Sequence, residues 1–498
     1  MADYLHGAYG AIQAVGNRVA DDSQGAIVYV GTAPVHTVEG GANNVNKPIL
    51  VRNIADARKH FGYSDDWASY TLCEAMFVHL MMKGVGPLVL INVLDPAKAA
   101  HKNASPTTAS KTPVNGVIQI ASAESAILDS VTVKTQDNTP VTKVKGADYT
   151  LAYNAEKKIL TITSIGDGLG SAALTVEYDT IKPSGVAASD VIGTTDDLGT
   201  NTGLYAIRNV YQMTGLIPSF LAAPGFSDTA AVNAAMTAVS LKVNGHWDAY
   251  CFADIPLADG VTPLTLATVK TYKDSNGYNK PNETVYWPMA KGIDGRKYHL
   301  SVLAAANFQE LLIAQGGVPY KTASNTECPI IENLYEGASV TGKVYDDTII
   351  NEKLNKNGIA SAAFVGGRWA IWGYHSADYD QENADKKNVS ETSLMMLYYI
   401  SNDFQHRRPV DVDKPMTAND LASIVSEEQS RIDALLSIGA LTYGEVSLNA
   451  SYQAKSDIMN GDYSFLFNIT TTPLARSLTA IVNWTEDGFV TYFESMAA

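Results

Sequence analysis

The sequence predicts an α/β layer architecture that is interrupted by an all-β insert. Up to about residue 99 and again after residue 184, apolar runs typical of strands alternate with segments whose apolar residues recur at helical spacing. Between these two parts, short period-two runs follow one another at regular spacing. The chain has 498 residues, of which 46% are hydrophobic, so it can form more than one core and is not disordered throughout.

The first part of the chain supplies strands and helices in alternation. Residues 1–20 have little core-forming content and are either an extended arm or a frayed terminus. After them, strands are expected at 25–34, 47–52 and 87–94, and helices at 53–61 and 67–83. The run at 87–94 is continuously apolar, which is typical of a strand buried on both faces.

A polar Ser/Thr/Pro segment at 104–113 is typical of a linker and opens the insert. The five runs that follow predict a small β-sandwich within residues 103–183, with strands at 116–120, 129–133, 148–153, 159–163 and 173–178. A surface loop tolerates such an insertion because the entropy cost of loop closure grows slowly with length. The α/β pattern then resumes, with helices expected at 204–213 and 229–243 and strands starting at 218 and 248.

The C-terminal third predicts one amphipathic helix followed by strands. Thr417 and Asp420 have the spacing of a capping box, and Gly439 suits the left-handed position after a helix end. One face of this helix is an apolar stripe. The other face, which is either solvated or turned toward a partner, carries Ser423, Glu427, Glu428, Ser430 and Asp433. Strands are expected at 441–448, 463–470 and 477–484.

A short apolar strand is expected at the C-terminus, made of Phe489, Val490, Thr491, Tyr492 and Phe493. Its aromatic faces and unpaired backbone groups are costly to leave in water. We therefore expect it either to close the sheet of its own subunit or to add to a neighbour's.

Charge and cysteine content exclude several classes of protein. There are 36 basic and 52 acidic residues, net charge −16, without a basic cluster, so direct binding of nucleic acid or of an anionic membrane is not expected. Neither a secretory signal nor a membrane-spanning run is visible, which favours synthesis and assembly in a cytosol. Cys73, Cys251 and Cys328 have no metal-ligand spacing and are expected to be core thiols, and no cofactor or metal is expected.

Motifs for catalysis are weak. The Gly225-Phe-Ser227 turn lacks the frame of a nucleophile elbow, and no Ser/His/Asp set can be assigned from spacing. Two alternatives to a structural protein stay open from the residues alone. One is an α/β hydrolase with dispersed site residues, and the other is a surface-array or adhesion protein, which would need a signal peptide.

The order of several short motifs resembles the tail sheath proteins of contractile phages and related contractile particles. These motifs are His6-Gly7, the strand end at 30–34, Phe61-Gly62, the boxes at 191–196 and 223–227, the strand end at 254–256, and the segments 354–359, 371–373 and 412–417. The resemblance covers essentially the whole chain. One departure is Arg476, where many relatives have an acidic residue.

The resemblance implies a structural protein and not an enzyme: a subunit that polymerises with itself as stacked hexameric rings around an inner tail tube protein. It further implies a subtilisin-like topology without its catalysis, contacts with baseplate and tail terminator proteins, and a place in the virion tail after assembly in the host cytoplasm. The polar helix face becomes a candidate tube-facing surface. An N-terminal arm (1–20), with Ala11, Ile12, Gln13, Ala14 and Val15 as its strand, and a C-terminal arm (485–498) would add strands to neighbouring subunits. The core would then comprise 21–102 and 184–345, the insert 103–183, and the C-terminal α+β assembly domain 346–484.

Overall fold

An eight-stranded sheet forms the centre of the body. The structure, a computed structural model, describes residues 25–335, 345–380, 387, 389–449, 455–489 and 496. The strand order is β2-β3-β1-β11-β12-β15-β19-β20, in which the inner strands are parallel and the two edge strands, β2 and β20, are antiparallel to their neighbours. The strands are β1 Ala26–Gly31, β2 Ile49–Val51, β3 Leu88–Asn92, β11 Pro218–Ala222, β12 Tyr250–Asp254, β15 Glu283–Tyr286, β19 Ile359–Val365 and β20 Arg368–Trp372.

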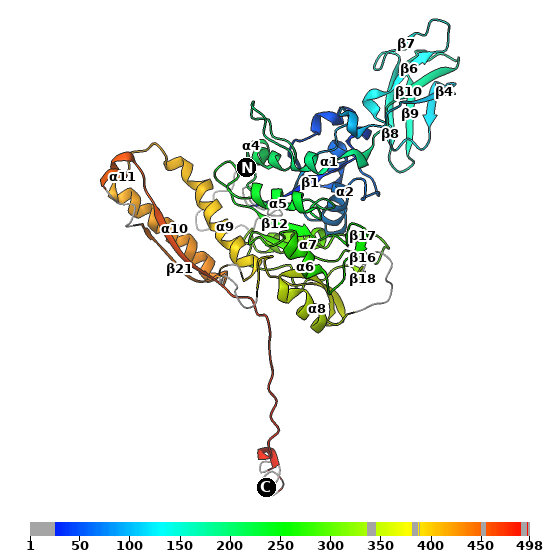
Figure 1. The fold of residues 1–498 in the computed structure, drawn as a ribbon. Coiled ribbons are helices and arrows are strands. Elements are labelled where there is room, and N and C mark those ends of the chain that lie inside the picture. The colour runs from blue at the N-terminus through cyan, green and yellow to red at the C-terminus, as the bar shows by residue number, and fades with distance from the viewer. Residues whose placement is uncertain are drawn as a thin grey trace, which may run out of the picture.

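Helices cover both faces of this sheet, so the body has three layers (Figure 1). In β1, Ile27 and Tyr29 enter one core while Val28 and Val30 enter the other, as the alternation of a strand buried on both faces requires. The first core contains residues of α1 Ile54–Phe61, α2 Leu72–Ala75 with its π-helical continuation Met76–Lys83, and α7 Leu300–Ala314. The second contains residues of α3 Ala188–Ile192, α4 Val210–Thr214, α5 Ala230–Val239, α6 Val269–Ser275 and α8 Asp347–Lys353.

The insert forms two packed sheets that project from the body (Figure 1). One has the order β4-β10-β6-β7 and the other β5-β9-β8, with a shared apolar core. The strands are β4 Thr107–Lys111, β5 Val117–Ile120, β6 Thr132–Thr135, β7 Thr142–Lys143, β8 Tyr149–Asn154, β9 Ile159–Ser164 and β10 Leu174–Tyr178. The expectation that 104–113 is only a linker was wrong. β4 is a polar edge strand held by its backbone pairing with β10, which needs no apolar alternation.

A separate helix–sheet unit follows the body. It consists of α9 Glu391–Arg407, α10 Ala418–Ser437, β21 Leu441–Leu448, α11 Lys455–Asn460 and β22 Phe465–Thr471. The capping box is confirmed, because the Thr417 side chain accepts from the Asp420 backbone N–H while the Asp420 carboxylate accepts from the Thr417 backbone N–H. Short strands elsewhere are β13 Ala258–Asp259, β14 Thr262–Pro263, β16 Ala290–Gly292, β17 Lys297–Tyr298 and β18 Ile330–Asn333.

Candidate assembly surface

The two strands β21 and β22 form a small amphipathic sheet. They pair antiparallel from Leu441 opposite Thr471 to Leu448 opposite Phe465. One face is apolar, with Val446 buried and Phe467 half-buried, while the other exposes Tyr443 and Leu466. In the described part of the chain this sheet contains only these two strands, so each strand has one edge without a neighbouring strand. Such edges offer backbone donors and acceptors to an added strand.

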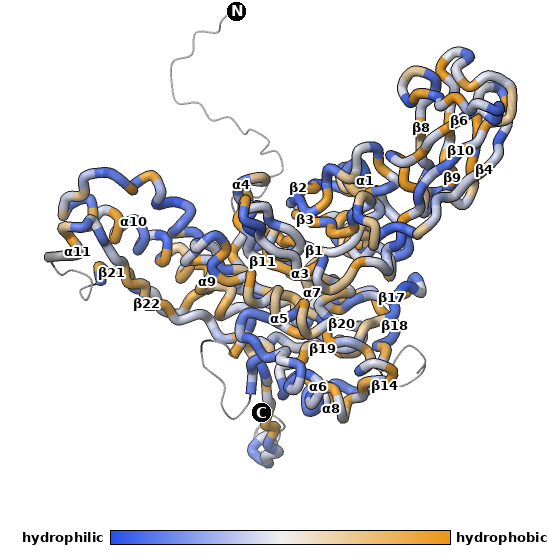
Figure 2. Tube along the Cα trace, turned by 45° about the horizontal axis from the view of Figure 1, so that its top comes forward, coloured by the Kyte–Doolittle hydropathy of each residue, from blue (hydrophilic) through white to orange (hydrophobic). Residues whose placement is uncertain are grey.

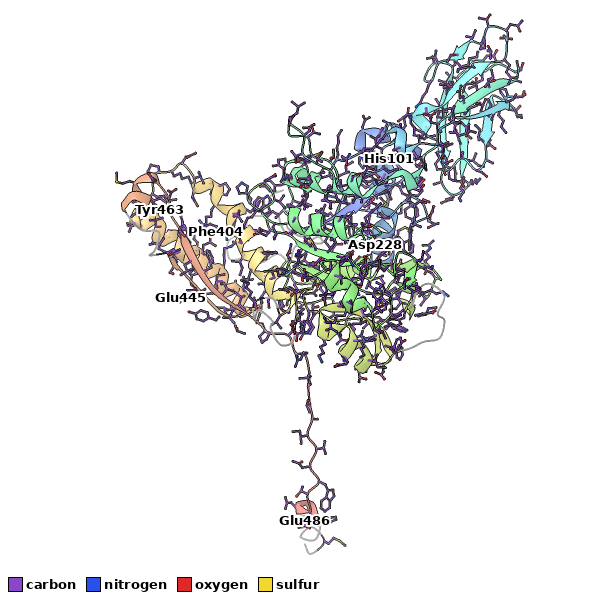
Figure 3. The ribbon with its side chains drawn as sticks, in the orientation of Figure 1. His101, Asp228, Phe404, Glu445, Tyr463 and Glu486 are labelled. Carbon is purple, nitrogen blue, oxygen red and sulfur yellow. The ribbon has the colours of Figure 1, made fainter. Side chains whose placement is uncertain are left out.

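Helices α9 and α10 cover the apolar face of this sheet. Phe404 of α9 lies against Phe465 and Phe467, with ring centroids 5.8 and 5.6 Å away; Figure 3 labels Phe404 on α9 and Glu445 on the neighbouring strand β21. A Cβ on Gly444 would lie 2.2 Å from Ile432 Cγ2, so glycine lets α10 approach β21 closely. The two helices thus fix the position of the sheet.

An ionic cluster joins α9 to α10. Glu428 accepts hydrogen bonds from Arg407 Nη1 and Nη2, each at 2.7 Å, and from Arg408 Nε at 2.8 Å. Burial acts to raise the pKa of the Glu428 carboxyl, but these hydrogen bonds and charges outweigh burial and hold the pKa below its usual value. The expectation that Glu428 faces outward was wrong, because the residue is only 2% exposed. Its role is to fasten the two helices together.

Replacing Glu428 with Gln is expected to destabilise the helix–sheet unit by about 2 kcal/mol, because both arginines lose the buried carboxylate that they share, although each keeps a more exposed acidic partner. The matched control is Glu427→Gln on the same helix. Glu427 has a side chain that is 60% exposed and a single ion pair with Arg408, so its loss is expected to cost under about 1 kcal/mol. Thermal melts of the two variants make the comparison, and equal melting temperatures would contradict the role given to Glu428.

The other polar residues named on α10 are exposed. Ser423, Glu427, Ser430 and Asp433 all lie on the solvent side of the helix, and Asp433 accepts a hydrogen bond from Gln429 at 2.8 Å. The surface is therefore available to a partner, and its facing a tube stays a prediction.

The first turn of α9 is anchored in the body by a buried carboxyl group. Glu391 accepts hydrogen bonds from the hydroxyls of Thr284 on β15, at 2.8 Å, and Thr322, at 2.5 Å. Burial raises the pKa of Glu391 to about 7, although both hydroxyl bonds act to lower it. The helix that carries the C-terminal sheet is thus fixed to the central sheet at this residue.

Replacing Glu391 with Gln is expected to stabilise the protein at pH 8 and to leave it unchanged near pH 4.5. Folding raises the pKa of this carboxyl from 4.5 to about 7, so the wild type loses stability as the pH rises through this window and remains penalised above it. The neutral amide avoids this penalty, which is roughly 3 kcal/mol at pH 8. Melting temperatures of both proteins between pH 4.5 and 8 test this, and a constant difference across the range would contradict it.

After β22 the chain leaves the fold as an extended segment. Thr472 is still attached, with its N–H on Ala440 and its hydroxyl on Gly439, and the following residues run away from the body to Glu486, labelled at the far end in Figure 3. Leu478, Val482 and Trp484 are 92%, 90% and 79% exposed. In an extended chain residues 478, 480, 482 and 484 share one face, which is apolar. In Figure 2 the tube of this segment leads toward the C label.

The expected strand at 477–484 is therefore not part of the subunit's own sheet. Its alternating pattern suits a strand, but within the described residues no strand pairs with it. At the C-terminal arm, Phe489 lies in a helical turn, with its N–H donating to the Glu486 carbonyl oxygen at 2.9 Å, where a strand had been expected to begin. Residues 490–493 and the N-terminal arm residues Ala11 to Val15 lie outside the described residues.

A buried polar cluster lies at the carboxyl ends of the parallel strands, where an α/β enzyme would place its site. His299 Nδ1 is 2.6 Å from Glu74 Oε2, and Ser301 donates its hydroxyl to Asp254 at the end of β12. Burial alone would lower the pKa of His299, but Glu74 and Asp254 raise it to about 10. The serine therefore faces a carboxylate and the histidine is held as a cation, which is the reverse of a nucleophile activated by a neutral imidazole.

Among the described residues no group of three or more His, Cys, Asp or Glu side chains is placed to hold a metal ion. Cys73, Cys251 and Cys328 are buried free thiols. Within the same ranges no helix has the length and apolar character needed to cross a membrane. His375 is buried, stacks on Tyr379 and lies 2.5 Å from the Val389 carbonyl oxygen.

Curated relatives match between 61% and 96% of the chain. The tail sheath protein of Burkholderia phage BcepMu is 24% identical over 494 residues, which is 96% of each chain. The tail sheath protein of Escherichia phage P2 is 23% identical over 372 residues, 72% of this chain and 86% of the relative. The chain is similar to phage tail sheath proteins. The resemblance to tail sheath proteins that was inferred from the sequence is confirmed. No family model matches the chain.

Solved structures of sheath proteins share this fold. The sheath of the extracellular contractile injection system PVC, in the contracted state, has a TM-score of 0.52 at 11% identity and covers 97% of this chain and 99% of its own. The helical sheath of the anti-feeding prophage, also contracted, has a TM-score of 0.51 at 13% identity and covers 98% and 100%. The likeness confirms a mixed α/β fold built on a largely parallel sheet.

The sequence does contain a signal for the inward position of Glu428. Glu428 stands four residues after Ile424 and four before Ile432, and both of these are buried on the apolar stripe of α10. A charged residue within an apolar stripe needs a cation from another element. The pair Arg407-Arg408 at the end of the preceding helix supplies it.

Proposed function

We propose that this chain is the sheath subunit of a contractile tail, which polymerises as stacked hexameric rings around an inner tube and contracts to drive the tube through a cell envelope. The observation that carries the proposal is the extended segment at 473–486, which has an apolar face and pairs with no strand among the described residues of its own subunit. The sheet β21–β22, with free edges in the described chain, is complementary to such a segment.

Exchange of strands between neighbours suits a lattice whose subunits move. Backbone hydrogen bonds hold the donated strand in a neighbour's sheet. The segment before the strand can change direction without breaking these hydrogen bonds or the fold of the donating subunit. The polymer then stays connected as subunits rotate. On this proposal the donated strand lies at 477–484, nearer to the body than the arm at 489–493.

Further partners follow from the same proposal. The exposed polar face of α10, with Glu427 and Asp433, is available for contact with an inner tube protein. Baseplate and tail terminator proteins would cap the two ends of the polymer, in a virion tail assembled in the host cytoplasm. The body is inferred to have a subtilisin-like topology in which the Glu74–His299 cluster is structural. The hydrolase alternative would require an accessible nucleophile in that cluster, and Ser301 is fully buried.

Electron microscopy and sedimentation of the purified chain test the proposal. We expect hollow tubes or stacked six-membered rings under conditions that favour polymerisation, such as concentrated protein and excluded-volume agents. A chain that stays monomeric under all such conditions would contradict a self-assembling sheath.

A further inference from the structure

A groove lies between the sheet of the body and α9, beside the first described residue of the chain. Phe220 and Tyr250 line it from the central sheet, Pro319 from a loop, and Tyr398 and His406 from α9. Most of these side chains are aromatic or apolar, and Tyr398 and His406 are half-buried. Covering an exposed apolar groove of this kind with a segment of chain is favourable, because it removes apolar surface from water.

Gly25 itself lines the groove. It has a left-handed φ of +58°, and the next residue enters the sheet at once, because the Ala26 N–H donates to the Ile217 carbonyl at 2.8 Å. Ile217 also belongs to the lining. The chain that precedes Gly25 therefore starts from the groove and not from a remote surface, and the sequence has 24 residues before this point.

We propose that residues 16–24 of the same chain lie over this groove, with the Val19 side chain as their apolar contact in it. Val19 is six residues before Gly25, and an extended chain spans at most about 3.5 Å per residue, so Val19 lies within about 20 Å of Gly25. An effective concentration in the millimolar range favours this intramolecular occupant over a second copy in dilute solution.

Docking of residues 16–24 would set the direction in which the first part of the chain leaves. The residues before them would start beside α9, close to the C-terminal helix–sheet unit. Ordering part of the arm in advance lowers the entropy cost of pairing residues 11–15 with a neighbour. The docking itself does not depend on that pairing, so it can be tested on unassembled subunits.

Disulfide trapping in the full-length chain tests the proposal. Val19→Cys is combined with His406→Cys inside the groove, or with His246→Cys as the matched control. His246 is exposed and lies outside the groove lining. It is nevertheless close to His406, because His246 packs on Trp247, Trp247 contacts Tyr211, and Tyr211 contacts His406. A freely moving arm would reach both histidine positions, whereas a docked one reaches only His406. The three native cysteines are buried and leave the background low.

We expect at least tenfold faster cross-linking to position 406 than to position 246 in dilute, unassembled protein. A mixture of isotopically heavy and light chains then gives heavy–heavy and light–light cross-linked peptides only. Equal rates at the two positions would mean an undocked arm, and mixed heavy–light peptides would mean that a second copy fills the groove. Either of these results, or the absence of a cross-link at position 406, overturns the proposal.

Discussion

Replacing Glu74 with Gln is expected to lower the free energy of unfolding by about 3 kcal/mol, among the largest effects of any single substitution in the body. Glu74 accepts the His299 backbone N–H at 2.7 Å through one oxygen and contacts the ring nitrogen at 2.6 Å through the other. It thereby joins α2 to the start of α7 across one core. The amide would leave a largely buried imidazolium without its main counter-charge.

The pH dependence separates this ionic role from simple packing. Folding raises the pKa of His299 from 6.5 to about 10, so the stabilisation is complete below pH 6.5 and is lost as the pH rises toward 10. The wild type is therefore expected to lose more stability than the Glu74→Gln variant between pH 7 and 10. Melting temperatures at stepped pH measure this difference.

Glu310→Gln is the matched control for Glu74→Gln. Glu310 lies on α7, its side chain is 56% exposed, and it pairs with Lys83 at 3.1 Å, so its replacement is expected to change stability by under about 1 kcal/mol. If Glu74→Gln melts like this control, the Glu74–His299 pair does not hold the body together.

The fold could be predicted from the sequence where local patterns decide it. The alternating runs correctly predicted the strands β5, β8, β9 and β10 of the insert, and the spacing of Thr417 and Asp420 correctly predicted the start of α10. In each of these the interactions that specify the element lie within a few residues or on one face of it. The continuous apolar run at 87–94 likewise gave β3, which is buried on both faces.

Features that depend on distant partners could not be read from local patterns. β4 has almost no apolar residue and is a strand because β10, more than sixty residues later, pairs with it. The cluster of Glu74 and His299 joins residues that are 225 positions apart in the sequence, and neither belongs to a motif. The segment at 477–484 has a strand pattern without a partner in the described chain, which local propensity cannot reveal.

Deleting residues 473–498 is expected to abolish assembly while leaving the melting temperature of the subunit unchanged. All side chains described from Ala475 to Phe489 are exposed, and none of them belongs to an apolar core of the subunit. Their loss should therefore cost the isolated subunit little, whereas a polymer linked through donated strands would lose its connections. Sedimentation and electron microscopy measure assembly, and a large drop in the melting temperature of the monomer would show that the segment serves its own subunit.

Point substitutions on the two faces of this segment give a sharper comparison. Val482→Asp places a charge on the apolar face that the proposed strand buries in a neighbour, and Thr479→Asp places the same charge on the opposite face. We expect the first to raise the protein concentration needed for polymerisation at least about tenfold, which corresponds to about 1.4 kcal/mol, and the second to change it little. Deletion of 489–498 alone identifies the donor: continued assembly assigns it to 477–484, whereas loss of assembly assigns it to the terminal arm. Equal effects of the two aspartates would contradict the burial of one face and, with it, donation of this segment as a strand.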